Sequence, residues 1–152
     1  MRILVSACLL GVCCKYSGGD NADPAVIALQ EGVELIPVCP EQLGGLPTPR
    51  PCAERAGARV MTEAGEEVTP QFQKGAEETL RLAKLLGCRA ALLKSRSPSC
   101  GSTEIYDGSF SHRRVLGRGV TAEKLVQAGI PVFDEEHLDA LKCFVFCEKA
   151  DI

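Results

Sequence analysis

Short apolar runs alternate along the chain with longer segments in which apolar residues recur every three or four positions. The runs are four or five residues long and are bounded by glycine, proline or polar residues, which is typical of buried parallel strands. The longer segments begin near Asp, Thr or Pro and have an apolar face, as amphipathic helices do. We predict strands at residues 3–7, 34–38, 90–93 and 130–133, and helices at residues 23–32, 69–87, 121–129 and 134–149.

The alternation of strands and helices predicts an α/β fold with a mostly parallel sheet. Pro37 cannot donate a backbone hydrogen bond, so the second strand should lie at an edge of the sheet or end there. Residues 39–57 are rich in glycine and proline and form a connection so long that a functional role is expected. Residues 58–69 resemble a small hairpin. The expected helix caps are Asp23, Thr69 and Asp134.

Length and charge narrow the class of protein. The 152 residues predict a single domain over 1–152, and the net charge of −3 gives no bulk attraction to nucleic acid or to an anionic membrane. His112, Arg113 and Arg114 form a local basic patch, which we interpret as solvated surface while a weak RNA contact stays open. No run approaches the roughly 18 apolar residues of a membrane span, and the first strand is not a targeting segment. A cytoplasmic location is therefore expected, and the oligomeric state is left undetermined.

Nine cysteines are the most unusual feature of the composition. The number of cysteines is odd, and the chain is large enough to fold without disulfide bonds. Metal binding or catalysis is therefore favoured over disulfides. Cys8, Cys39 and Cys100 each follow a predicted strand, and ligand sites in parallel sheets form beyond the carboxyl ends of strands. These three thiols should therefore meet at one edge of the sheet. The remaining cysteines are Cys13 and Cys14 near the first of the three, Cys52 in the long connection, Cys88 at a helix end, and Cys143 and Cys147 one helical turn apart.

Three converging thiols leave several interpretations open. Zinc suits three ligands and an open fourth position, although the short spacings of structural zinc sites are missing. An iron–sulfur cluster is the second candidate, and ordinary packing of small apolar side chains is the third. Cys88 looks structural, and the phenylalanines beside Cys143 and Cys147 favour packing for that pair. Four charged or polar residues near this edge are interpreted as solvated surface or turn residues unless other evidence assigns them: Arg50, Lys94, Arg96 and Ser97.

Four segments together resemble a known family. The segments "SACLLGVCCKYSGGDN", "PVCPEQLGGLPTPRPCAE", "KSRSPSCGS" and "IYDGSFSHRRVLGRGVTAEKL" are similar to a small bacterial family whose characterised members are iron–sulfur-dependent 2-thiouracil desulfurases. The resemblance implies a three-layer Rossmann-like domain with a 4Fe–4S cluster held by Cys8, Cys39 and Cys100, one iron being open to the sulfur of the substrate. It also implies catalytic roles for Glu41, in the Cys-Pro-Glu motif, and for Ser97.

The chain departs from the family pattern near the pocket. Lys15-Tyr16-Ser17-Gly18 stands where Arg-Tyr-Asp-Gly is frequent, Cys52 stands where proline is common, and Cys13 and Cys14 are extra thiols. These departures concern the choice of substrate more than the cluster.

The function implied by the resemblance is non-redox desulfuration of a thiolated pyrimidine, either a 2-thiouracil-like base or a nucleoside, to the oxo form with release of sulfide. Glu41 would act as a general base toward water, and Ser97 would hold the heterocycle. Two alternatives stay open: a sulfur-transfer protein linked to tRNA thiolation on the same scaffold, and a zinc-bound or metal-free binding module.

Overall fold

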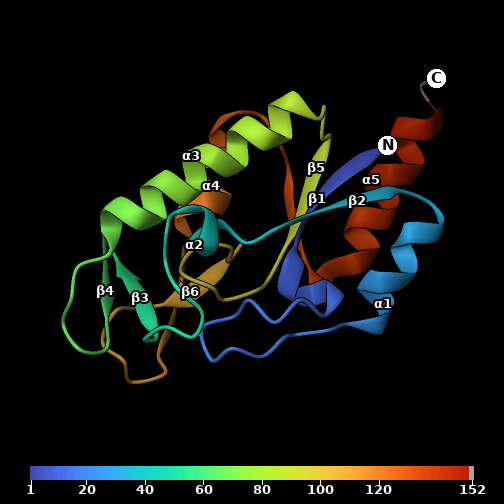
Figure 1. Ribbon diagram of the computed structural model, residues 1–152. Coiled ribbons are helices and arrows are strands. Elements are labelled where there is room, and N and C mark those ends of the chain that lie inside the picture. Colours follow the sequence, from blue (N-terminus) through green and yellow to red (C-terminus); the bar gives the residue numbers. More distant parts are fainter. Residues whose placement is uncertain (151–152) are drawn as a thin grey trace.

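Four parallel strands form the centre of the computed structural model, which describes residues 1–150 (Figure 1). The strand order is β2 (Glu34–Val38), β1 (Arg2–Ser6), β5 (Ala90–Leu93) and β8 (Val132–Asp134). Leu4 of β1 pairs with Ile36 on one side and with Ala91 on the other. The predicted parallel α/β sheet is confirmed, and β2 lies at its edge, as Pro37 indicated.

Helices cover both faces of this sheet, which makes three layers (Figure 1). The covering helices are the short α1 (Pro24–Ile27) and the longer α3 (Thr69–Leu85), α4 (Val120–Gln127) and α5 (Leu138–Ala150). Ile3 and Val5 of β1 pack with α1 and α5, whereas Leu4 packs with α3 and α4. Because successive side chains of a strand point to opposite faces, a strand covered on both faces must be apolar throughout.

The helix boundaries differ in detail from the prediction. Asp23 caps α1 as expected and accepts a hydrogen bond from Ala25 N at 2.9 Å, but the helix soon gives way to a 3-10 turn at Ala28–Glu31. Asp134 is likewise a cap and accepts from Glu136 N at 3.0 Å, at the start of a 3-10 turn before α5. Thr69 was wrongly predicted as a cap: it lies inside α3, and its hydroxyl accepts from Val60 N at 2.8 Å instead.

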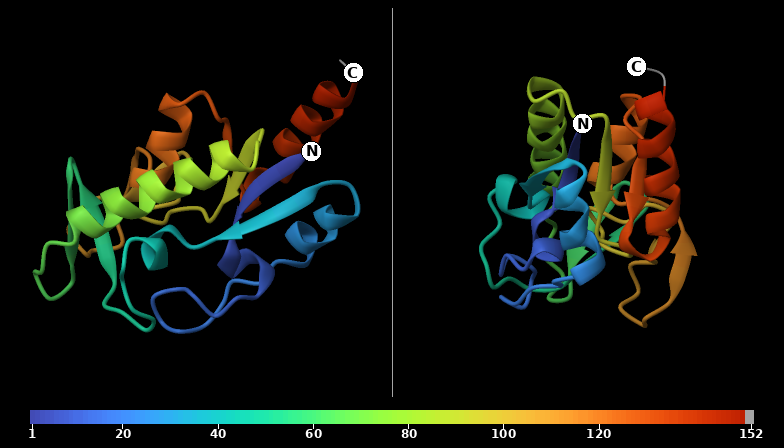
Figure 2. Two further views of the ribbon diagram at one scale, coloured as in Figure 1. Left: turned by 45° about the horizontal axis from the view of Figure 1, so that its top comes forward. Right: turned by 90° about the vertical axis from the view of Figure 1, so that its right-hand side faces the viewer.

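Two antiparallel hairpins and one short helix were missed by the sequence analysis. β3 (Ala53–Ala56) pairs with β4 (Arg59–Thr62), and β6 (Glu104–Tyr106) pairs with β7 (Arg114–Leu116). The hairpin predicted at residues 58–69 is partly confirmed. β4 forms its first arm, and the second arm returns antiparallel to it through the bridge of Met61 with Glu67 and through hydrogen bonds from Thr62 N to Glu66 O at 2.8 Å and from Val68 N to Val60 O at 2.9 Å. The β3–β4 hairpin lies at the end of the molecule away from α1 and α5 (Figures 1 and 2).

The missed helix α2 (Pro40–Leu43) follows β2 and packs directly on α3. Glycine makes this approach feasible, because a Cβ added to Gly75 would lie 1.9 Å from the carbonyl oxygen of Pro40, and one added to Gly44 would lie 2.0 Å from that of Gln71. The residues just before and within α2 are therefore placed by a backbone-to-backbone contact.

The segment after β5 is anchored to the start of α4. Backbone N–H groups of Val120 and Thr121 donate to the carbonyls of Pro98 and Ser99 at 2.9 Å, and Gly119 N donates to Gly101 O at 2.9 Å. These bonds use the N-terminal donors of α4, so the glycine-rich turn before this helix is a packing turn. Within residues 1–150, no helix is both long enough and apolar enough to cross a membrane.

Candidate functional site

A cavity of about 450 Å³ lies beyond the carboxyl ends of β1, β2 and β5. Parallel pairing brings the ends of these strands to the same edge of the sheet, and the segments that follow them form the cavity wall. All five residues predicted for the site line it, namely Cys8, Cys39, Glu41, Ser97 and Cys100. The structure therefore brings together side chains that are up to 92 positions apart in the sequence.

The three predicted ligand thiols are close enough to influence one another electrostatically. The pKa of Cys100 is raised to about 12, mainly by burial and partly by the charges of Glu41, Cys8 and Cys39, while a hydrogen bond with Ser6 opposes the increase. Burial also raises the pKa of Cys8, with a contribution of the same sign from Cys39. The thiols of Cys8 and Cys100 therefore resist deprotonation until a cation offsets burial and repulsion, and a metal centre would supply that charge.

The spacing of these donors argues against a single metal ion. None of the nine cysteines, all within residues 1–150, forms a disulfide. In the same part of the chain, no three Cys, His, Asp or Glu side chains are grouped closely enough to hold one ion, so the zinc alternative is unsupported. A cubane cluster instead takes each thiolate on a different iron, which requires ligands that surround a larger volume. Three thiols spread around one cavity fit that arrangement.

Cys14 is a fourth thiol at the cavity that the sequence analysis did not assign. It is 2% exposed and lines the cavity, and its carbonyl accepts a hydrogen bond from Cys39 Sγ at 3.7 Å. The pKa of Cys14 is raised to about 12, mainly by burial and partly by the charges of Cys39 and Cys8. Its place beside Cys13 in the sequence gave no signal, because only the loop conformation turns one thiol inward and leaves the other exposed.

The other cysteines have different surroundings. Cys52 is half-buried and lines the cavity, and Cys88 is buried in the core as predicted. Cys143 and Cys147 are exposed, so the prediction that they pack is wrong. Their helix is partnered on one side only, and Phe146 beside them is 75% exposed.

Glu41 lies in the first turn of α2 and is mostly buried. Burial raises its pKa, whereas the charge of Arg50 and a hydrogen bond from it lower the pKa. The Arg50 Nε–Glu41 Oε1 distance is 3.3 Å, and the Arg50 side chain is only 3% exposed. Interpreting Arg50 as a solvated loop cation was therefore wrong, because the long connection folds back over it.

Ser97 organises the turn that presents Cys100. Its hydroxyl oxygen accepts hydrogen bonds from the backbone N–H groups of Ser99 at 3.1 Å and Cys100 at 3.0 Å. A hydroxyl also carries one donor, and Ser97 lines the cavity. The turn-forming and ligand-facing interpretations of Ser97 are thus compatible.

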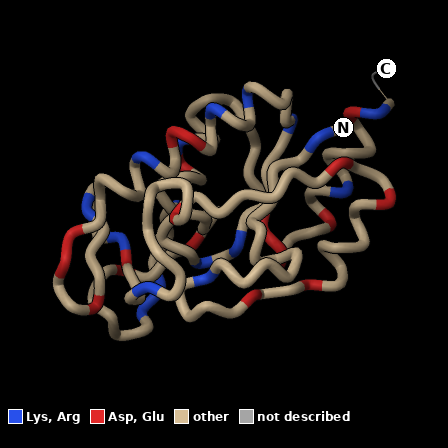
Figure 3. Tube along the Cα trace, in the orientation of Figure 1, with Lys and Arg blue, Asp and Glu red and all other residues tan. Residues whose placement is uncertain are grey.

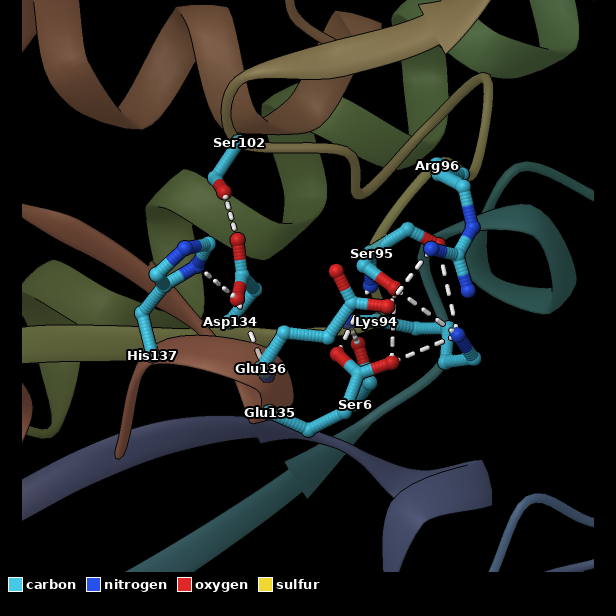
Figure 4. Close-up of polar contacts among 9 residues, drawn as sticks. All are labelled: Ser6, Lys94, Ser95, Arg96, Ser102, Asp134, Glu135, Glu136 and His137. Atoms are coloured by element: carbon cyan, nitrogen blue, oxygen red, sulfur yellow. Dashed lines mark hydrogen bonds and ion pairs between the residues drawn. The ribbon is translucent and has the colours of Figure 1, made fainter. Parts of the chain in front are cut away.

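Lys94 and Arg96, which also line the cavity, are held by two acidic residues that follow β8 (Figure 4). Lys94 Nζ lies 2.5 Å from Glu135 Oε1, and Arg96 Nη1 lies 2.5 Å from Glu136 Oε1. Glu135 also accepts from Ser95 N at 2.8 Å and from Ser95 Oγ at 2.7 Å. Burial opposes ionisation of Glu135, but the hydrogen bonds from Lys94 and Ser95 outweigh it and its pKa is lowered. Both cations are therefore partly buried and paired with a carboxylate, so the interpretation of them as solvated loop cations holds only in part.

Aromatic side chains stand at the cavity wall on the side of the β6–β7 hairpin. Tyr106, Phe110 and His112 line it there, and Tyr16 does so from the segment after β1. Phe110 and His112 have φ values of 56° and 61°, a conformation that non-glycine residues adopt only when their surroundings enforce it. Buried Glu54 contributes by accepting hydrogen bonds from Gly108 N and Phe110 N.

No periodicity marked this wall in the sequence. His112 is exposed, as expected, and it also lines the cavity. Flat rings at a cavity wall offer a surface on which a planar heterocycle can stack.

Comparison with known proteins adds a consistent result. Residues 3–137 match the sequence model of the 2-thiouracil desulfurase family. An uncharacterized protein of Bacillus subtilis (strain 168), YbbK, is 42% identical over 147 residues, covering 90% of this chain and 97% of that protein. The solved structure of the 4Fe–4S-dependent thiouracil desulfidase TudS superposes with a TM-score of 0.91 at 46% identity, covering 96% of this chain and 98% of TudS.

Proposed function

The chain belongs to the 2-thiouracil desulfurase family, and from this premise we propose that it is an enzyme that hydrolyses the carbon–sulfur bond of a 2-thiouracil-like base or nucleoside. In this reaction water replaces the thiocarbonyl sulfur, so thiouracil and water give uracil and hydrogen sulfide, with no net transfer of electrons. The observation that carries the proposal is the convergence of three cysteines, Glu41 and Ser97 on one cavity.

We assign Cys8, Cys39 and Cys100 as the residues that would hold a 4Fe–4S cluster. When bound through three thiolates, such a cluster supplies a soft Lewis acid at its open iron, which suits a thiocarbonyl sulfur. The segments after β1, β2 and β5 each contribute one ligand, so cluster binding would also tie these three segments together.

Glu41 is the proposed general base. It lies two residues after Cys39 and lines the same cavity as Cys100. Its carboxylate would accept a proton from the water that attacks the ring carbon, and later return it to the leaving sulfur. Its partly buried position excludes bulk water, which strengthens the effect of its charge.

Ser97 and the aromatic wall are proposed to hold the heterocycle. The Ser97 hydroxyl accepts two backbone hydrogen bonds and has its own hydrogen left to donate to the ring. Tyr106, Phe110 and His112 would stack on the ring and orient the thiocarbonyl group toward the three thiols.

The sulfur-transfer alternative has less support. Lys and Arg residues are interspersed with Asp and Glu along the trace (Figure 3). Two residues of the basic patch that was considered for RNA binding lie near carboxylates. Arg113 is 3.9 Å from Asp107, and Arg114 is 3.9 Å from Glu104. Nothing in this distribution favours a thiolated RNA over a small pyrimidine.

The test is anaerobic reconstitution with iron and sulfide, followed by incubation with 2-thiouracil while thiocarbonyl absorbance and released sulfide are measured. Cys8→Ala, Cys39→Ala and Cys100→Ala should each lose iron and activity. Cys143→Ser, on the exposed side of α5, is the matched control and should keep both. A wild-type protein that binds no cluster, or that turns over only thiolated RNA, would refute the proposal.

A further inference from the structure

The guanidinium of Arg50 is buried where three cavity-forming segments meet. Its Nε donates to Glu41 Oε1 at 3.3 Å, and its Nη1 donates to Pro47 O at 3.2 Å and to Thr48 Oγ1 at 3.0 Å. Its Nη2 donates to Cys14 O at 2.9 Å, and the backbone N of Arg50 donates to Tyr16 O at 2.9 Å. Every nitrogen of the side chain is therefore engaged.

These contacts differ in kind. Among residues 1–150, Glu41 is the one residue whose carboxylate lies within 4.0 Å of the Arg50 side chain, and the other partners are neutral oxygens. A buried cation needs a counter-charge, and Glu41 supplies it. The carbonyls of Pro47 and Cys14 belong to the backbone, so they hold the guanidinium in place independently of Glu41.

This arrangement treats the two carboxylate oxygens of Glu41 differently. Oε1 is anchored by Arg50, whereas no hydrogen bond to Oε2 is found within the described part of the chain. The carbonyl oxygen of Cys14 accepts a hydrogen bond from Arg50 and another from the Cys39 thiol. The Arg50 guanidinium therefore lies near a proposed cluster ligand.

We propose that Arg50 is a positioning residue that fixes Glu41 through Oε1 and leaves Oε2 free for the attacking water. The inference rests on the proposed function, because it assigns Glu41 the role of base. Lysine cannot replace arginine here, since a single ammonium cannot donate at once to Glu41, to Pro47 and Thr48, and to Cys14.

The experiment compares anaerobically reconstituted wild type with R50K, R50M, E41Q and the double variant R50M/E41Q. We expect R50K and R50M to lower kcat by about 10- to 100-fold, the size of effect that a misplaced catalytic group produces. KM should change by less than about 3-fold, because Arg50 does not contact the ring. Iron content and the visible spectrum of the cluster should match wild type. R59M is the matched control, because Arg59 is exposed on the β3–β4 hairpin and outside the cavity.

Non-additivity separates positioning from a general structural effect. If Arg50 acts through Glu41, R50M should lower kcat by less than about 2-fold further once E41Q is present. Single effects that multiply in the double variant, or an R50K protein with wild-type kcat, would overturn the inference.

Crystal structures of wild type and R50K give a readout that does not depend on the substrate. The Glu41 carboxylate should shift or lose its single conformation in R50K, and an unchanged carboxylate would overturn the inference even if wild type proved inactive on 2-thiouracil. Inactivity of wild type with a displaced Glu41 in R50K would instead refute the proposed function alone.

Discussion

Gly75→Ala tests whether the α2–α3 contact sets the geometry of the site. The added Cβ would lie 1.9 Å from Pro40 O and 2.8 Å from the Pro40 carbonyl carbon, whereas real Cβ contacts essentially never fall below 3.0 Å. The obstacle is backbone, so no rotamer change relieves it and α2 must move by about 1 Å. Cys39 and Glu41 move with α2, because Cys39 directly precedes that helix and Glu41 lies in its first turn.

Two opposing effects determine the change in stability. Alanine favours a helix interior over glycine by about 1 kcal/mol, whereas overpacking of a close contact typically costs about 1–3 kcal/mol. The free energy of unfolding should therefore fall by at most about 2 kcal/mol, which lowers Tm by up to roughly 8 °C for a chain of this size. Activity should fall much more, by about 100-fold, because a shift of 1 Å misplaces the base relative to its target.

The assay measures Tm by circular dichroism, iron per chain after reconstitution, and kcat on 2-thiouracil. Lys74→Ala is the matched control, because it adds helix propensity at the neighbouring exposed position and leaves the contact intact. A Gly75→Ala protein with wild-type iron content and kcat would refute the argument that this contact positions Cys39 and Glu41.

Three further predictions follow from other parts of the structure. Glu135→Gln should lower the free energy of unfolding by about 1–3 kcal/mol, because Lys94 loses its partly buried counter-charge; an unchanged denaturant midpoint would contradict this. Phe110→Ala should raise KM by about 2- to 12-fold through lost stacking while kcat changes less, and steady-state kinetics with an unaltered KM would exclude Phe110 from ring binding. The hydrogen bond with Asp134 raises the pKa of His137 above its ordinary value of 6.5. The stabilising contribution of His137 is therefore fully present below that value and is lost as pH rises through the folded pKa, so the Tm difference between wild type and His137→Gln should be larger at pH 5.5 than at pH 8.5. A difference that does not depend on pH would argue against the Asp134 contact.

Much of the core architecture was already determined by the sequence alone. Four short apolar runs predicted the strands of the sheet, and Pro37 predicted the edge position of β2. Because parallel strands bring their carboxyl ends to one edge, the positions of Cys8, Cys39 and Cys100 after three of these strands predicted that they would share a cavity. The resemblance added Glu41 and Ser97, which line the same cavity.

Only the tertiary structure decided what surrounds those residues. α2 and the two hairpins are three or four residues long per element, too short for a periodic pattern to show. Arg50 and Cys14 are buried because the long connection folds onto the segment after β1, and neither residue's burial follows from its neighbours in sequence. Periodicity reports burial within one regular element, whereas the wall of this cavity is made largely of loops and very short elements brought together from distant parts of the chain.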